Sequence, residues 1–560
     1  MSQPPPQQQG FGAPYEPRPG VYGDPGQPGP GPQLGPQLGP RPGPYGPPPQ
    51  PPYGSPQFPA EPAPVVLGGP GGGGRSRSRL AGLVAGGLAG LLVVGTGVWL
   101  VVGGDGGLGD GKPVAQESTA PTPPDTKDGP EDGKGPRKPG AAELSKGRKD
   151  GEAPVRWVEN NRIDLPEGGV NAYGPWITGG IAVQALYRTV SGHALDDGAR
   201  RWSLRLPADI CAAPTTPSTD GKIVVGVRSD TSEEAQCDRI LMIDLTTGKT
   251  GWKAELDRKG FQDGLSDIVM AVNGDVVTVG RLTRTDAYRI SDGKHLWDRL
   301  PGPCQPFGLA GGAVPLAALE CRKDPGDGEA AQQEVRRIDP ATGRTVWTYQ
   351  VKKGWEVDQF YSTNPPVISL RQGGAEGKWA IAMLNDDGTF RSQPDPGTDD
   401  YQTRCGGDMR NESGNLDNCY GVAADADTLY LATKPASEAR PANAVVAFDM
   451  STGKRKWKAA SPATQTLMPL RVEGGKVLLH LGPSPLGTDK VSGGIMALGP
   501  GGGTPQPVLR HPTPAVDAER TFQDPQVHYA NGRSLLLSPY VSGVDDRAEL
   551  ELRTMIAFGD

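Results

Sequence analysis

The sequence predicts an all-β fold, a β-propeller of four-stranded blades, preceded by one transmembrane helix and a disordered tail. Two observations predict the propeller. A ten-residue unit recurs as Ile243–Trp252, Ile338–Trp347 and Phe448–Trp457, and a spacing of roughly 45–50 residues is typical of propellers and solenoids. From Val155 onward, short β-branched runs alternate with Gly, Asp and Pro turns and show no long helical period, which is typical of an all-β domain.

Each unit predicts a β-hairpin that places an aromatic residue on the blade. An apolar strand ends at Asp, a Thr-Gly pair turns the chain with Gly at positive φ, and Trp follows four residues after Gly. A ring of such blades packs face to face and leaves no long exposed sheet edge. Weaker copies at Leu195–Trp202 and Tyr288–Trp297 complete a set of five repeat-docking tryptophans: Trp202, Trp252, Trp297, Trp347 and Trp457.

The weaker repeats set the number of blades. Turns fall near positions 198, 248, 293, 343, 388, 453, 500 and 559, which predicts eight blades, and seven is the alternative if one weak repeat is not a blade. The turn at Gly388 is followed by Phe390 instead of Trp. The strand Met555–Phe558 lacks an outer neighbour, so we expect Val155–Val158, with Trp157, to complete the last blade and close the ring.

The residues before the propeller predict three segments. Residues 1–79 are rich in Pro, Gly and Gln and hold too little aliphatic surface to fold, so we expect a disordered tail. Residues 80–102 carry no charge and are long enough to span a bilayer as one helix. More than seventy residues precede this stretch, which disfavours a cleaved signal peptide. Residues 103–154 predict a flexible charged linker to the propeller, residues 155–560.

The charges beside the predicted helix set its orientation. Arg75, Arg77 and Arg79 precede it, and Asp105 and Asp110 follow it. The positive-inside rule then predicts a single-pass cell-membrane protein with a cytoplasmic N-terminus and an extracytoplasmic propeller. A stripe of small residues, which includes Gly82, Gly86 and Gly90, also indicates a homodimer through the helix; the alternative is a merely Gly/Ala-rich helix.

The cysteines indicate disulfide bonds. An even number of cysteines in an extracytoplasmic domain is typical of disulfides, and the repeat turns enclose them two at a time. Pairing within each blade gives 211–237, 304–321 and 405–419. No Cys-x-x-Cys occurs and no His lies near any cysteine in sequence, so we expect no metal site there. The six are Cys211, Cys237, Cys304, Cys321, Cys405 and Cys419.

The apolar-Asp-x-x-Thr-Gly-x-x-x-Trp units resemble the tryptophan-docking repeats of the pyrroloquinoline-quinone-like β-propeller superfamily, over about Val155–Asp560. The whole arrangement is similar to actinobacterial membrane-anchored proteins with a Pro/Gly-rich tail and an outer propeller. The resemblance implies the architecture. The superfamily includes quinoprotein dehydrogenases, an outer-membrane assembly scaffold and sensor domains of kinases, so function has to be argued from the site.

Signals for catalysis are weak. The quinoprotein dehydrogenases stack their cofactor on a disulfide between adjacent cysteines, and this chain has no Cys-Cys pair. Their Ca²⁺ ligands match no motif here, and no Ser/His/Asp set has a local signature. We therefore expect no catalytic residues, no cofactor and no resident metal. His193 and His295 fall in repeat turns, where we expect exposure, whereas His480 and His528 fall in strands.

Residues 395–418 form the longest insertion between repeat turns and hold six acidic residues around Cys405. A solvated loop pinned by a disulfide is the main interpretation, with a Ca²⁺ site or a binding loop as the alternative, although the spacing of an EF-hand is absent.

These observations together predict a non-enzymatic, membrane-anchored propeller that binds or scaffolds a protein or a cell-envelope ligand. The net charge of −7 argues against a nucleic-acid partner. Two alternatives are a sensor that signals through the helix and a quinone-dependent oxidoreductase, and a search for quinone absorbance would distinguish the latter.

Overall fold

The computed structural model describes residues 139–560 apart from 260–262, 267, 282–283, 322–331, 374–377, 406–413, 438–440 and 488. The predicted disordered tail, the predicted transmembrane helix and linker residues 103–138 lie outside the described residues. Within the described part of the chain, no helix is long and apolar enough to cross a membrane.

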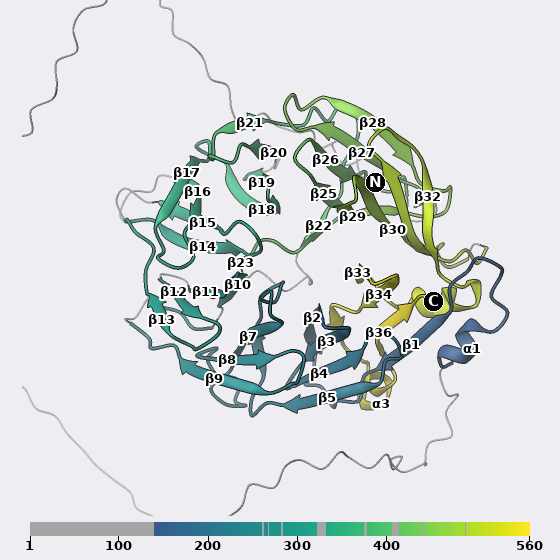
Figure 1. Cartoon of the computed structure of the whole chain (residues 1–560), viewed down its shortest axis with the longest axis horizontal. Coiled ribbons are helices and arrows are strands. Elements are labelled where there is room, and N and C mark those ends of the chain that lie inside the picture. Colours follow the sequence, from purple (N-terminus) through teal and green to yellow (C-terminus); the bar gives the residue numbers. More distant parts are fainter. Residues whose placement is uncertain are drawn as a thin grey trace, which may run out of the picture. The chain divides into compact units, whose positions relative to one another are not determined.

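The described residues form an eight-bladed β-propeller, which confirms the predicted all-β fold and the preferred number of blades (Figure 1). In each blade, four antiparallel strands run from the ring's axis to its rim. The first four blades are blade 1, with β2 (Val170–Thr178), β3 (Ile181–Leu186), β4 (Thr189–Ala194) and β5 (Arg200–Arg205); blade 2, with β6 (Ile210–Ala212), β7 (Lys222–Val227), β8 (Arg239–Asp244) and β9 (Thr250–Glu255); blade 3, with β10 (Val269–Asn273), β11 (Val276–Arg281), β12 (Arg284–Arg289) and β13 (His295–Trp297); and blade 4, with β14 (Gln305–Ala310), β15 (Leu316–Cys321), β16 (Gln332–Ile338) and β17 (Thr345–Gln350).

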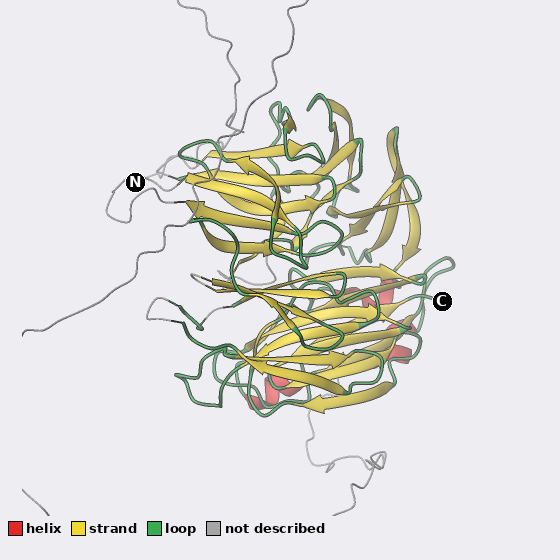
Figure 2. Cartoon of the chain, turned by 60° about the vertical axis from the view of Figure 1, so that its left-hand side comes forward, coloured by secondary structure: helices red, strands yellow, loops and turns green. Residues whose placement is uncertain are grey.

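The second half of the ring repeats the same meander. A few short helices lie among the strands (Figure 2). Blade 5 has β18 (Glu356–Thr363), β19 (Pro366–Gln372), β20 (Lys378–Leu384) and β21 (Phe390–Ser392); blade 6 has β25 (Val422–Ala424), β26 (Thr428–Ala432), β27 (Ala444–Asp449) and β28 (Arg455–Ala460); blade 7 has β29 (Leu467–Glu473), β30 (Lys476–Leu481), β31 (Gly494–Gly499) and β32 (Gly502–Arg510); blade 8 has β33 (Gln526–Ala530), β34 (Arg533–Leu537), β36 (Arg553–Phe558) and β1 (Val155–Asn160). The additional elements are α1 (Ala141–Ser145), β22 (Arg404–Cys405), β23 (Gly414–Asn415), β24 (Cys419–Tyr420), η1 (Thr513–Ala515), α2 (Val516–Glu519), β35 (Tyr540–Val541) and α3 (Asp546–Leu550).

The recurring unit forms the turn between the third and fourth strands of a blade. In blade 2, the Asp244 carboxylate accepts hydrogen bonds from the backbone N–H groups of Thr246 and Thr247, both at 2.9 Å. Gly248 then adopts φ +68° and donates its N–H to the Asp244 carbonyl. This side-chain-to-backbone turn explains why Asp and Gly stand at these two positions of the unit.

Each docking tryptophan packs on the turn glycine of the next blade. The Trp202 ring lies so close to Gly248 that a Cβ there would come within 2.4 Å of the indole, so the position requires glycine. The Trp202 Nε1–H donates to the carbonyl of Leu245, three residues before that glycine, at 3.2 Å. The other pairs in which a ring covers the next glycine are Trp157 on Gly198, Trp252 on Gly293, Trp297 on Gly343, Trp347 on Gly388 and Trp457 on Gly502.

Strand β1 closes the ring as expected. It pairs antiparallel with β36, with Val155 opposite Phe558 and Trp157 opposite Ala557. The Trp157 Nε1–H donates to the carbonyl of Leu195 in blade 1 at 3.1 Å. The first and last strands therefore share blade 8, and its tryptophan docks on blade 1.

The predicted linker extends too far toward the C-terminus. Leu144 on α1 and Ala153 are buried with Val155, Ile556 and Phe558 in one hydrophobic cluster. The Ala153 N–H also donates to the carbonyl of Arg510 at 2.8 Å. Residues 139–154 are thus part of the propeller, because these apolar side chains fill the space between blades 7 and 8.

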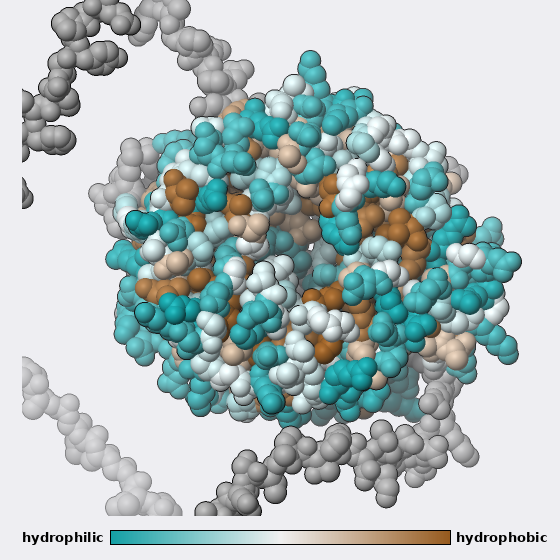
Figure 3. Space-filling view, viewed as in Figure 1, coloured by the Kyte–Doolittle hydropathy of each residue, from teal (hydrophilic) through white to brown (hydrophobic). Residues whose placement is uncertain are grey.

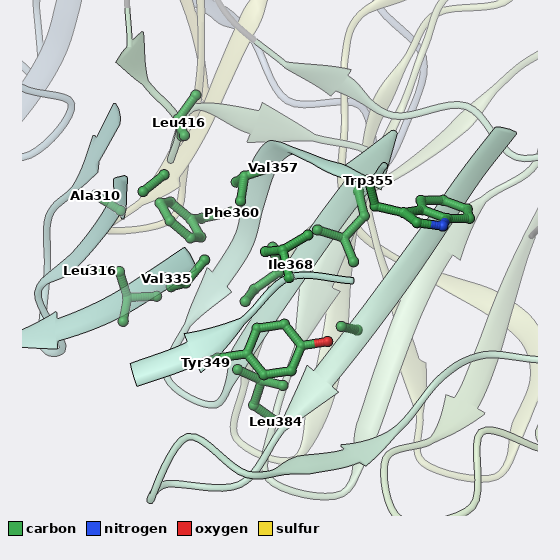
Figure 4. Close-up of a cluster of buried hydrophobic side chains, with 14 of the residues drawn as sticks. Ala310, Leu316, Val335, Tyr349, Trp355, Val357, Phe360, Ile368, Leu384 and Leu416 are labelled. Carbon is green, nitrogen blue, oxygen red and sulfur yellow. The ribbon is translucent and has the colours of Figure 1, made fainter. Parts of the chain in front are cut away.

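The largest hydrophobic clusters lie between neighbouring blades, not within one blade. Figure 4 shows the cluster between blades 4 and 5, where Val335 and Leu316 of blade 4 face Phe360, Ile368 and Leu384 of blade 5. All five side chains are nearly or completely buried. Burial of both faces of each sheet is what the ring supplies, since a single blade has no second layer.

Candidate functional site

A cavity of about 620 Å³ lies at the axis of the ring. Residues of blades 1, 2, 4, 5, 7 and 8 line it, and the space-filling view shows this face hollowed at the centre of the ring (Figure 3). The inner strands converge at the axis because every blade begins there. The cavity lies within the size range of small-molecule sites in proteins.

An inserted segment, residues 414–420, forms one wall of this axial cavity. Its strand β23 pairs in parallel with the inner strand β14, with Gly308 opposite Gly414. Asn415 donates its amide to the carbonyl of Ala213 in blade 2 at 2.8 Å and accepts the Met270 N–H of blade 3 at 2.9 Å. The segment therefore crosses the inner strands of several blades and fixes them to one another.

The next two residues of the segment continue this crossing. Leu416 donates its N–H to the carbonyl of Leu309 in blade 4 and accepts the N–H of Phe360 in blade 5. Asp417 accepts the Gly311 N–H at 2.6 Å and the Thr215 hydroxyl at 3.1 Å. Burial raises the pKa of Asp417, and these two donors oppose that shift.

The main interpretation of residues 395–418, a solvated loop pinned by a disulfide, holds for the disulfide and for exposed residues such as Asp395 and Asp400. It is wrong for the end of the insertion, because residues 415–420 are partly or fully buried at the axis. The backbone bonds that they make with several inner strands explain the burial, because a buried peptide group has to be hydrogen-bonded. The available sequence signal was the length of the insertion together with its cysteine pair; its position on the axis follows only from the topology.

Two titratable side chains on the cavity wall have pKa values that are shifted toward the neutral form. The His528 imidazole, on strand β33 of blade 8, lines the cavity, and burial lowers its pKa to about 4. Burial raises the pKa of Tyr420. Both side chains are therefore uncharged at pH 7.

Asp358, another titratable group of the cavity wall, has partners. Asp358, on β18, forms an ion pair with Arg371 at 2.6 Å and accepts a hydrogen bond from Ser369 at 2.8 Å. The cavity lining contains no Lys or Arg among the described residues. The axial cavity thus presents mostly neutral hydrogen-bonding groups.

The six cysteines form three disulfides, with the same pairing that the repeat turns indicated: Cys211–Cys237, Cys304–Cys321 and Cys405–Cys419. The third disulfide joins β22 to β24 and lines the axial cavity. Its two cysteines are 14 residues apart in sequence, so it lacks the adjacent pair that the resemblance to quinoprotein dehydrogenases would require.

The burial of the histidines differs in part from what the sequence predicted. His193 is buried, not exposed: it lies on β4 and stacks beside Trp157, with ring centroids 6.2 Å apart. The expectation for His193 was wrong because the docked tryptophan of blade 8 covers it. His295 is exposed as expected, and His480 lies on β30.

Two groups of side chains in the described residues are close enough to share a metal ion, and neither lines the cavity. Cys304 and Cys321 lie near Glu334, but the two sulfurs are bonded to each other. Asp164, Asp546 and Glu549 form an acidic group. Glu549 already accepts the Leu165 N–H at 2.8 Å, which explains its burial without an ion.

Comparisons with known proteins agree with the fold. The family model described as the outer membrane protein assembly factor BamB matches residues 160–304 and 331–503, which is more than half of the chain. No match was found among curated proteins.

Solved structures with a similar fold include BamB from Moraxella catarrhalis, with 16% identity and a TM-score of 0.37, over 70% of this chain and 98% of that one. The quinohemoprotein alcohol dehydrogenase of Comamonas testosteroni has 14% identity and a TM-score of 0.41, over 76% of this chain and 78% of that one. The enzyme ADHIIG of Pseudomonas putida HK5 has 12% identity and a TM-score of 0.41, over 73% and 76%.

Proposed function

The chain belongs to the family of the outer membrane protein assembly factor BamB, a pyrroloquinoline-quinone-like β-propeller family, and on this premise we propose that it is a non-enzymatic module that binds a protein partner. We further propose that a helix at residues 80–102 anchors it in the cell membrane, with the propeller outside. The propeller supports this role because its blades give a rigid frame whose loops present a surface.

The observation that carries the proposal is a group of exposed apolar side chains at one end of blade 7. Leu486 is 80% exposed and Val491 is 40% exposed, both in the connection between β30 and β31, and Val508 near the end of β32 is 43% exposed. The His511 N–H donates to the carbonyl of Gly493, which holds the two segments together. These three are half of the large exposed apolar residues in the described chain, and all belong to blade 7 or its connection; exposed apolar patches are typical of protein-binding surfaces.

Site-specific photo-crosslinking in cells tests this surface. A photoreactive residue replaces Leu486, and the matched control replaces Val544, which is 94% exposed in the connection between β35 and α3. We expect one protein adduct of defined mass from position 486 and none from position 544. The absence of an adduct at 486, or the same adduct at both positions, would refute the surface on blade 7.

The proposed topology has its own test. Protease added to intact cells should digest the propeller or cut within residues 103–138, while the N-terminal tail remains protected. A propeller that survives until the cells are lysed would contradict the outside location.

A further inference from the structure

The axial cavity contains polar side chains that have no hydrogen-bond partner in the described residues. The side chains of Asn418, Tyr420, Gln526 and His528 line it, and no described residue forms a hydrogen bond with them. Because they line an accessible cavity, water or a bound ligand can form hydrogen bonds with them.

The charge of the wall restricts the ligand. Asp358 is paired with Arg371, and burial favours the neutral forms of Asp417 and His528. An anionic ligand would meet no Lys or Arg side chain on the described wall, and a cation would meet carboxylates that already have partners, Arg371 and Ser369 for Asp358 and Gly311 and Thr215 for Asp417. A charged ligand would therefore lose its hydration without compensation.

The shape and chemistry of the wall indicate a ligand with both polar and apolar surface. Phe307, Tyr173 and Tyr420 bring aromatic rings to a cavity that is otherwise rich in amide and hydroxyl groups. Amides and hydroxyls donate and accept hydrogen bonds, which matches a molecule that carries many hydroxyl groups. A purely apolar ligand would leave these groups unsatisfied.

We propose that the axial cavity binds an uncharged saccharide of one or two sugar units. Gln526 and His528 of blade 8 and Asn418 of the inserted segment hydrogen-bond its hydroxyls, and the aromatic rings contact its C–H faces. The volume of about 620 Å³ accommodates a ligand of that size. This inference does not depend on the surface of blade 7, so either can fail alone.

Titration calorimetry on the purified full chain, in a detergent without a sugar headgroup, tests the proposal. The probes are glucose, maltose and N-acetylglucosamine, with glucuronate and glucosamine as charged counterparts. We expect at least one neutral sugar to bind at one site per chain and the charged sugars to bind at least about tenfold more weakly. No binding of any neutral probe at about 10 mM, or equal binding of charged probes, would overturn it.

A matched pair of variants locates the binding. Gln526→Ala removes an amide from the cavity wall, and Gln506→Ala removes one from the exposed face of β32. We expect Gln526→Ala to weaken binding by about tenfold or more and Gln506→Ala to leave it unchanged. Asn418→Ala replaces Gln526→Ala if the melting temperature shows that the latter unfolds. Equal binding by the cavity and surface variants would contradict the assigned site.

Discussion

Six of the eight joints between neighbouring blades are closed by a tryptophan, whereas the joints between blades 5 and 6 and between blades 7 and 8 are not. In the tryptophan joints, an indole covers the turn glycine of the next blade. Where the indole forms a hydrogen bond, its N–H reaches a carbonyl two or three residues before that glycine, as Trp252 does with Ile290 at 2.7 Å. The repeat therefore supplies packing and a hydrogen bond with one side chain.

The joint between blades 5 and 6 keeps the hydrogen bond and replaces the packing. The Ser392 hydroxyl donates to the carbonyl of Met450 at 2.7 Å, again three residues before the turn glycine, Gly453. The backbone of Gln393 packs on Gly453 where an indole packs in the other joints. A Cβ on Gly453 would lie 1.7 Å from the Gln393 carbonyl oxygen. A serine and a close backbone contact thus substitute for tryptophan.

The joint between blades 7 and 8 uses residues from outside the repeat. His511 pairs with Glu519 of α2 at 2.8 Å, with both side chains fully buried. The His511 ring stacks on Phe558 of β36, with centroids 3.8 Å apart. Leu144 of α1 packs into the same cluster. The comparison shows that the ring tolerates different side chains at a joint provided that each joint is closely packed.

Removal of β1, the strand that closes the ring, should destabilise the propeller more than any other change considered below. A chain that starts at residue 139 keeps α1 and β1, whereas one that starts at residue 166 loses both and leaves blade 8 with an open edge. Truncation of a buried Trp to Ala alone costs about 3–5 kcal/mol, and the lost strand pairing adds to that cost. We expect the shorter chain to aggregate or melt far below the longer one. Equal melting temperatures would refute the closure.

A glycine beneath a docked ring should be far less replaceable than a free one. Gly248 and Gly274 both have positive φ, at +68° and +61°, but only Gly248 lies against Trp202, and a Cβ on Gly274 would contact nothing within 4 Å. Strain at positive φ costs both variants about 1–2 kcal/mol. Gly248→Ala should lose a further ~1–3 kcal/mol by displacing the ring. Chemical denaturation measures both, and equal losses would argue against docking as the constraint.

The closing joint should weaken in acid because it contains a buried histidine. Burial lowers the pKa of His193 beside Trp157, and the nearby Glu159 carboxylate only partly opposes this shift. Its folded pKa lies below the unfolded value of about 6.5, so the unfolded chain binds more protons as the pH falls below that value and stability decreases. His193→Gln should flatten the dependence of melting temperature on pH between about 7 and 5. The exposed His295→Gln variant is the control; an unchanged slope in His193→Gln would contradict this role.

The same comparison explains what could be predicted from sequence. The turn chemistry is local, so Asp244, Gly248 and Trp252 identify a blade without any knowledge of its neighbours, and the strand with Trp157 could be assigned to the last blade. The replacements at Ser392 and His511 are not part of the repeat, since they depend on which segments meet across a joint. The axial position of Asp417 and the cavity around it likewise depend on long-range topology.

The central claim is that the indole N–H, and not only the ring, contributes to a tryptophan joint, and Trp252 and Trp347 form a natural matched pair for it. Both rings cover a turn glycine, but the Trp347 Nε1 atom has no partner in the described residues. The Gly388 N–H donates to the carbonyl of Asn385, three residues earlier, whereas the Gly293 N–H donates to the carbonyl of Arg289, four residues earlier. The carbonyl that an indole N–H reaches in the other joints is therefore already hydrogen-bonded in the turn at Gly388.

The decisive measurement is the free energy of unfolding of Trp252→Phe and Trp347→Phe by chemical denaturation. Both substitutions lose similar ring area, and only Trp252→Phe leaves a carbonyl unpaired. We predict that Trp252→Phe destabilises the propeller by about 1 kcal/mol more than Trp347→Phe. Equal losses, or a larger loss for Trp347→Phe, would contradict the account.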